Sequence, residues 1–153
     1  MIDCEIFSVE YDYIATSIIT DVYVSDAVKV VSLSENGDID SYKCKGLWDT
    51  GATTSVISRK IVEKLRLPAV SKTQIFGVNG RFETTMHVID LCLPNKHIVR
   101  RVSAVLGVLM SGIDVLIGMD IITKGDFSIS NCNGRTLFSF RSYSEKERHK
   151  NSV

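Results

Sequence analysis

The stretch "GLWDTGATTSVIS", residues 46–58, places a single acidic residue between an apolar run and a turn. The apolar run would end a strand at Asp49 and bring its carboxylate to the edge of a core. Gly51 lets the backbone turn tightly and approach a neighbour, and Thr50 and Thr53 offer hydroxyls that can hold the loop. Two interpretations follow, a reactive carboxylate on a loop or an ordinary turn aspartate.

Short runs of β-branched and aromatic residues, separated by Gly, Asn, Asp and Ser, fill most of the chain and are typical of strands. Three Asn-Gly pairs, at 36–37, 79–80 and 133–134, favour tight hairpin turns. The pattern therefore predicts a mostly β fold. The expected strands are 13–24, 27–33, 41–48, 72–76, 82–93, 98–108, 127–130 and 136–140.

Signals for helices are few. Ser58 is a suitable cap for a helix that runs to Leu65, with Pro68 beyond its end. A second short helix is expected to begin at Asp120 and to end near Gly125.

The length of 153 residues and the hydrophobic content of 44% predict one domain, residues 1–141, with 1–12 as a possible extension. Residues 142–153 are charged and predict a flexible tail. No apolar run approaches the roughly 18 residues of a membrane span, and the first residues do not resemble a signal peptide. We therefore expect a cytoplasmic protein without a membrane partner.

The cysteines and the charges argue against two other kinds of site. Four cysteines lie about forty residues apart without a C-x-x-C pair, which predicts reduced thiols, no metal and no cofactor. A metal site that combines them with His87 or His97 is the alternative. Residues 1–40 hold nine acids and only Lys29, but the later basic residues are dispersed, which predicts no nucleic-acid partner.

Two further motifs follow the first in the chain. The segment "TQIFGVNGRFETTMHV", residues 73–88, is an expected hairpin, and "DVLIGMDII", residues 114–122, contains the apolar pair and glycine Leu116-Ile117-Gly118. Together and in this order, the three motifs resemble the retropepsin-like aspartic proteases, the family of the retroviral proteases and their cellular relatives. The resemblance covers most of residues 15–140.

This resemblance implies a closed β-barrel or sandwich with one or two short helices and one lobe per chain. It implies an endopeptidase in which Asp49 is the catalytic residue and the hairpin is a flap over the substrate. The implied loop-supporting residues are Thr50, Gly51, Ala52 and Thr53; the flap residues are Phe76, Gly77, Val78, Asn79, Gly80, Arg81 and Phe82; the hydrophobic-Gly motif is Leu116, Ile117 and Gly118.

The chain also departs from the retroviral pattern. Retroviral members usually carry an acid soon after D-T-G-A and an arginine after the later glycine, a pair that braces their dimer. Here Thr53, Thr54 and Met119 stand in those places. The chain therefore looks closer to the non-viral cellular or bacterial members, and the mode of dimerisation stays open.

Aspartic protease chemistry needs two carboxyl groups that share a proton. The chain has no second D-T-G or D-S-G, and it is too short for two lobes. The resemblance thus predicts a homodimer, in which Asp49 meets its symmetry mate and the two chains hold an extended peptide.

Two alternatives remain beside the turn aspartate. The domain could serve as a dimerisation or peptide-binding module without significant turnover, because a fold does not guarantee an activity. Asp49 could also be a phosphorylated nucleophile, although such loops belong on alternating α/β chains and this chain is β-rich.

Overall fold

The structure is a computed structural model, and it describes residues 5–28, 41–77 and 80–143. Strands dominate these ranges, and both helices are short, so the predicted fold class is confirmed. None of the helices in the described ranges is long and apolar enough to cross a membrane. The elements are β1 (Glu5–Tyr11), β2 (Ile18–Asp26), β3 (Ser41–Trp48), β4 (Val56–Ile57), α1 (Arg59–Leu65), β5 (Ser71–Gly77), β6 (Gly80–Cys92), β7 (Ile98–Leu106), β8 (Val115–Ile117), α2 (Met119–Ile122), β9 (Gly125–Cys132) and β10 (Arg135–Ser142).

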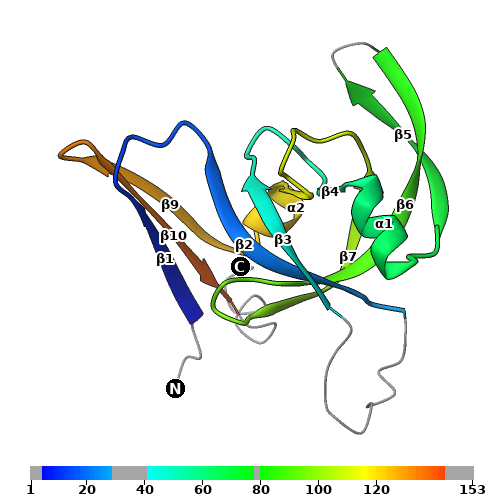
Figure 1. The fold of residues 1–153 in the computed structure, drawn as a ribbon, viewed down its shortest axis with the longest axis horizontal. Coiled ribbons are helices and arrows are strands. Elements are labelled where there is room, and N and C mark those ends of the chain that lie inside the picture. The colour runs from blue at the N-terminus through cyan, green and yellow to red at the C-terminus, as the bar shows by residue number, and fades with distance from the viewer. Residues whose placement is uncertain (1–4, 29–40, 78–79, 144–153) are drawn as a thin grey trace, which may run out of the picture.

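The larger sheet has seven strands in the order β2-β3-β8-β4-β7-β6-β5 (Figure 1). Strand β2 also pairs with β6, so the pairings return to their start and form a closed ring without β5. Closure leaves none of the six ring strands with a free edge along its whole length, and it encloses the apolar core. Strand β5 pairs only with β6 among the described strands and extends the sheet as a hairpin.

A second sheet has three antiparallel strands in the order β1-β10-β9. An aromatic cluster joins it to the larger sheet, because the Trp48 ring lies 5.1 Å from Phe138 and 4.9 Å from Phe140, centroid to centroid. Phe7 of β1 also packs on this tryptophan at 6.1 Å. Strand β1, which falls within the possible extension 1–12, therefore packs against the core.

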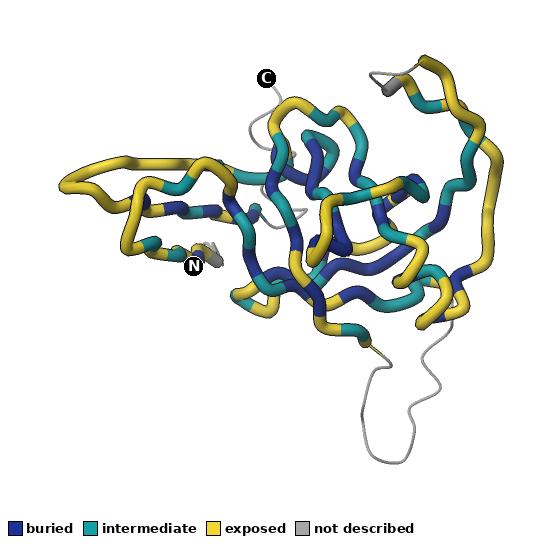
Figure 2. The backbone as a smooth tube through the Cα atoms, turned by 45° about the horizontal axis from the view of Figure 1, so that its top comes forward, coloured by how far each residue is buried: buried dark blue, intermediate teal, exposed yellow. Residues whose placement is uncertain are grey.

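Buried residues concentrate in the ring and in the inner face of the small sheet (Figure 2). The β5–β6 hairpin and the far end of the β9–β10 hairpin are mainly exposed. The turn between β9 and β10 has positive φ angles of 51° at Asn133 and 76° at Gly134, as expected for an Asn-Gly turn. The other two Asn-Gly pairs lie at least partly outside the described residues.

Six predicted strands are confirmed as β3, β5, β6, β7, β9 and β10, with ends within a few residues. The strand predicted over 13–24 was wrong at its start, because residues 12–17 cross between the sheets and β2 begins at Ile18. Tyr11 holds this crossing: its hydroxyl donates to Ile19 O at 2.8 Å and accepts from Ile19 N–H at 3.1 Å. Of the strand predicted over 27–33, residues 27 and 28 form a bend and the rest lies outside the described residues.

Helix α1 is confirmed, with Ser58 as its N-cap. The chain leaves it through Arg66, which has a left-handed φ of 50°. The second helix begins one residue earlier than predicted and is one turn long. Ser142, the first residue of the predicted charged tail, is 4% exposed and pairs with Glu5 in the small sheet, and residues 144–153 lie outside the described residues.

Candidate active site

Asp49 directly follows β3, at the point where this strand lies beside β8. The two strands are parallel, and Trp48 is in register with Ile117. The pairing continues one residue further, because Asp49 N–H donates to Ile117 O at 2.9 Å. The structure therefore brings the first and third sequence motifs together, although they are almost seventy residues apart.

The carboxylate of Asp49 is held by its own loop. Asp49 is half-buried, and its Oδ1 accepts a hydrogen bond from Gly51 N–H at 2.8 Å. A Cβ at position 51 would lie 3.2 Å from this oxygen, so glycine allows the close approach. Thr50 and Thr53 are exposed, while Ala52 is half-buried.

Gly118 is in close contact with the same loop. A Cβ at this position would lie 2.9 Å from Thr54 C and 3.0 Å from Ala52 O, which are backbone atoms that cannot swing away. The next residue, Met119, donates its N–H to Ala52 O at 2.8 Å. The Asp49 loop is thus held against the segment of Leu116, Ile117 and Gly118 by backbone hydrogen bonds on either side of Gly118.

Two residues of this region were not recognised as part of the site from the sequence. Ser55 is fully buried; its hydroxyl donates to Asp120 Oδ1 at 2.8 Å and accepts from Gly118 N–H at 3.0 Å. Asp120 was predicted only as a helix start, and a lone serine before an apolar pair has no local signature. A serine six residues after the motif aspartate becomes informative only once its partner is known.

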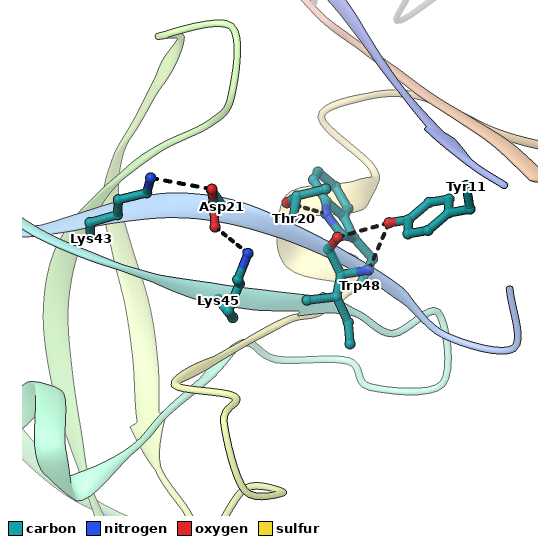
Figure 3. A network of polar contacts seen from close by, with 7 residues as sticks. Tyr11, Thr20, Asp21, Lys43, Lys45 and Trp48 are labelled. Atoms are coloured by element: carbon teal, nitrogen blue, oxygen red, sulfur yellow. Dashed lines mark hydrogen bonds and ion pairs between the residues drawn. The ribbon is translucent and has the colours of Figure 1, made fainter.

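Polar contacts also support β3, the strand that ends just before Asp49 (Figure 3). Trp48 Nε1–H donates to Thr20 Oγ1 at 3.0 Å, and both side chains are buried. Further along the same strand pair, Asp21 forms ion pairs with Lys45 at 2.6 Å and Lys43 at 3.3 Å. The hydrogen bond from Lys45 is the main cause that lowers the pKa of Asp21.

The β5–β6 hairpin carries the second motif. Phe76 pairs with Arg81, and Gly77 with Gly80, whereas Val78 and Asn79 lie outside the described residues. Phe76 is 76% exposed, and the Arg81 guanidinium carbon lies 4.9 Å from its ring centroid, within the range of a cation–π contact. Phe82 is also exposed. The hairpin and the loop after β3 extend toward the same side of the molecule in Figure 1.

The described thiols and histidines do not gather at this site. Among the described residues, no group of three or more His, Cys, Asp or Glu side chains could hold a metal ion. Cys44 is buried and free, and burial raises the pKa of its thiol to about 12. His87 is buried between Pro68 O and the Thr85 hydroxyl, each 2.9 Å from a ring nitrogen, which is a structural arrangement.

The amino-acid sequence matches a known protein family. A model of the aspartyl protease family matches residues 31–121, more than half of the 153 residues. The chain belongs to this aspartyl protease family. A solved structure of a retropepsin-like aspartic protease from Rickettsia conorii is similar, with a TM-score of 0.57 and 12% sequence identity over 94% of this chain and 98% of that one. This likeness supports the retropepsin-like fold. No curated protein is significantly similar to the chain in sequence.

Proposed function

We propose that the chain is a homodimeric aspartic endopeptidase in which Asp49 and the Asp49 of a second copy form the catalytic dyad. The observation that carries the proposal is the fastening of the Asp-Thr-Gly loop to the hydrophobic-Gly segment, with one half-buried carboxylate at its centre. A single carboxylate cannot both accept a proton from water and donate one to the substrate. The second must come from another chain, and a two-fold axis supplies it in the same geometry.

In the proposed reaction the two carboxyl groups share one proton. The ionised group takes a proton from a water molecule, which attacks the carbonyl carbon of the peptide bond. The neutral group donates its proton to the carbonyl oxygen, which gives a tetrahedral diol. The carbon–nitrogen bond then breaks: the carboxyl group that took the water proton passes it to the leaving nitrogen, and the other carboxylate recovers a proton from the diol hydroxyl as the carbonyl forms again. Thr50, Gly51, Ala52 and Thr53 support the loop, with the exposed Thr50 available to bond to the partner loop.

The substrate is an extended peptide or protein segment, and residues 76–82 of the β5–β6 hairpin are its moving cover. Two features support this role: the hairpin extends from the ring, and it presents the exposed side chains of Phe76 and Phe82. An extended peptide can pair with such a hairpin through its backbone, while the aromatic side chains contact apolar substrate residues.

The first experiment compares the purified protein with an Asp49→Asn variant on a diverse peptide library from about pH 4 to 7, the acidic side on which a shared-proton dyad works. We expect discrete cuts that disappear in the variant. Specific activity should rise with enzyme concentration and then level off, because dilution separates the protomers. An absence of cuts would favour a binding module without turnover, and equal cuts by both proteins would show that Asp49 is not the catalytic residue.

A mixing experiment then tests the shared dyad. When wild-type protein is equilibrated with an equal amount of the Asp49→Asn variant, random pairing leaves about a quarter of the dimers with two native carboxylates. Activity per wild-type subunit should fall to about half, and to about a tenth at ninefold excess of the variant. Activity that is insensitive to added variant would rule out a dyad shared between chains.

A further inference from the structure

Ser55 stands between the candidate catalytic loop and β4, and its side chain has no access to solvent. One hydroxyl performs two functions: it donates to Asp120 Oδ1 at 2.8 Å and accepts from Gly118 N–H at 3.0 Å. Buried polar groups that lose their partners cannot turn to water and are costly to leave unsatisfied. The Ser55 hydroxyl therefore links the segment after the catalytic loop to the segment that contains Gly118 and Asp120. No other side-chain group of Ser55 could make these two bonds.

The segments that Ser55 joins are the same two that hold Asp49. Asp49 N–H bonds to Ile117 O, and Met119 N–H bonds to Ala52 O. Ser55 adds a side-chain link at the far end of the loop, next to the close contact around Gly118. The backbone bonds hold the loop at its start and in its middle. The Ser55 hydroxyl holds the end of the loop, directly before the chain enters β4.

The position of this link is informative. The Ser55–Asp120 bond crosses between the same two segments as the two backbone bonds. A Cβ at Gly118 would lie 3.0 Å from the same oxygen, Asp120 Oδ1. The acceptor of the serine hydroxyl is therefore packed directly against the glycine that contacts the Asp49 loop.

We propose that Ser55 and Asp120 are positioning residues that hold the Asp49 loop against the Gly118 segment and so aim the carboxylate at its symmetry mate. This inference rests on the proposed function, because the orientation of the Asp49 carboxylate matters for catalysis only if it must meet a second carboxylate. Small displacements of reacting groups lower the rate of the chemical step strongly. The link should therefore influence turnover more than substrate binding.

The main test compares Ser55→Ala with Ser55→Thr. We expect Ser55→Ala to lower kcat by about a hundredfold while KM stays within about threefold, because the reacting groups move and the peptide-binding surface does not. Ser55→Thr keeps the hydroxyl and should restore kcat to within about tenfold of wild type, the remaining loss reflecting one extra methyl group in a packed site.

The matched control is Thr136→Val, on β10 of the small sheet. Thr136 is also fully buried, and its hydroxyl also accepts a backbone N–H, from Ala15, and donates to a side-chain oxygen, of Asn131. This variant loses an equivalent pair of bonds and should lose comparable thermal stability, but its kcat should stay within about twofold of wild type. Equal losses of kcat in Thr136→Val and Ser55→Ala would mean that the link is merely structural, and would overturn the proposal.

Two substitutions separate the negative charge of Asp120 from its role as a hydrogen-bond acceptor. Asp120→Asn keeps an oxygen that can accept from Ser55 Oγ–H, so kcat should stay within about threefold, whereas Asp120→Ala should lose about tenfold. A large loss in Asp120→Asn, together with a shifted pH profile, would show that the charge of Asp120 acts directly. That result would overturn the positioning role.

Amide hydrogen exchange separates this inference from the proposed function. Asp49 N–H and Met119 N–H report on the two backbone bonds of the loop, and both should exchange at least about tenfold faster in Ser55→Ala than in Thr136→Val. If the wild-type protein shows no Asp49-dependent cleavage, the proposed protease activity fails, but these exchange rates still decide whether Ser55 holds the loop. Unchanged rates in Ser55→Ala would overturn the inference, whatever the activity.

Discussion

The hydrogen bond between Trp48 and Thr20 allows a test of how much one polar contact stabilises β3, the strand that ends just before Asp49. Trp48 ends β3, is 5% exposed, and packs against the aromatic side chains of the small sheet. Its Nε1–H donates to Thr20 Oγ1 at 3.0 Å, and Thr20 is 4% exposed. We consider two variants, Trp48→Phe and Thr20→Val, and their combination.

Each variant removes one side of the same bond. Thr20→Val keeps the shape of the side chain but leaves a buried indole N–H without its acceptor, which should cost about 1–3 kcal/mol of unfolding free energy. Trp48→Phe leaves the threonine oxygen unsatisfied and also shrinks the ring, for a total of about 2–4 kcal/mol. The double variant should cost about 1 kcal/mol less than the sum, because the second change removes a group that is already without its partner.

Urea unfolding followed by far-UV circular dichroism is the suitable assay, because Trp48 is the single tryptophan and its fluorescence disappears in two of the proteins. All four proteins are compared at one protomer concentration, since dimer formation would shift the apparent stability. Costs that add to within about 0.3 kcal/mol would show that the two side chains are not coupled. That result would refute the assigned role of the indole N–H.

Two further predictions concern Gly118 and the thiols. Gly118→Ala should lower the unfolding free energy by about 1–3 kcal/mol in urea titrations, because the new Cβ meets backbone atoms of Thr54 and Ala52; an unchanged midpoint would contradict this. Iodoacetamide at about pH 8 should label the exposed Cys132 and spare the buried Cys44 in the folded protein. The pKa of the Cys44 thiol rises from 9.0 to about 12 on folding, so its contribution to stability is complete below pH 9.0 and is lost as the pH rises toward 12. Rapid labelling of Cys44 under native conditions would contradict its burial.

Much of the local structure could be read from the residues in order. The Asn133-Gly134 turn, the Ser58 cap of α1 and six of the strands follow from turn chemistry, capping and the spacing of apolar side chains. These features depend on neighbours within a few residues, so a short window of sequence contains the whole signal. The Asp49 motif is local in the same sense, whereas the family resemblance needs three such motifs in their order along the chain.

Three of the described strands, β1, β4 and β8, were not predicted from the sequence. Strands β4 and β8 have only two and three residues, too few for any alternation to appear, and they exist because they complete the closed ring. Strand β1 alternates apolar and polar residues, but it lies in the acidic first part of the chain. It is stabilised by Phe7 packing on the Trp48 cluster, a contact between residues about forty positions apart.

The sequence by itself determined which residue carries the candidate chemistry and which family the chain resembles, because each motif is contiguous and the three motifs follow one another in a recognisable order. Only the tertiary structure decided what holds that residue in place. The bonds from Asp49 to Ile117 and from Ser55 to Asp120 join segments separated by more than sixty residues. Such contacts form only when the whole ring closes. The sequence around each residue therefore does not predict which distant residue it will contact.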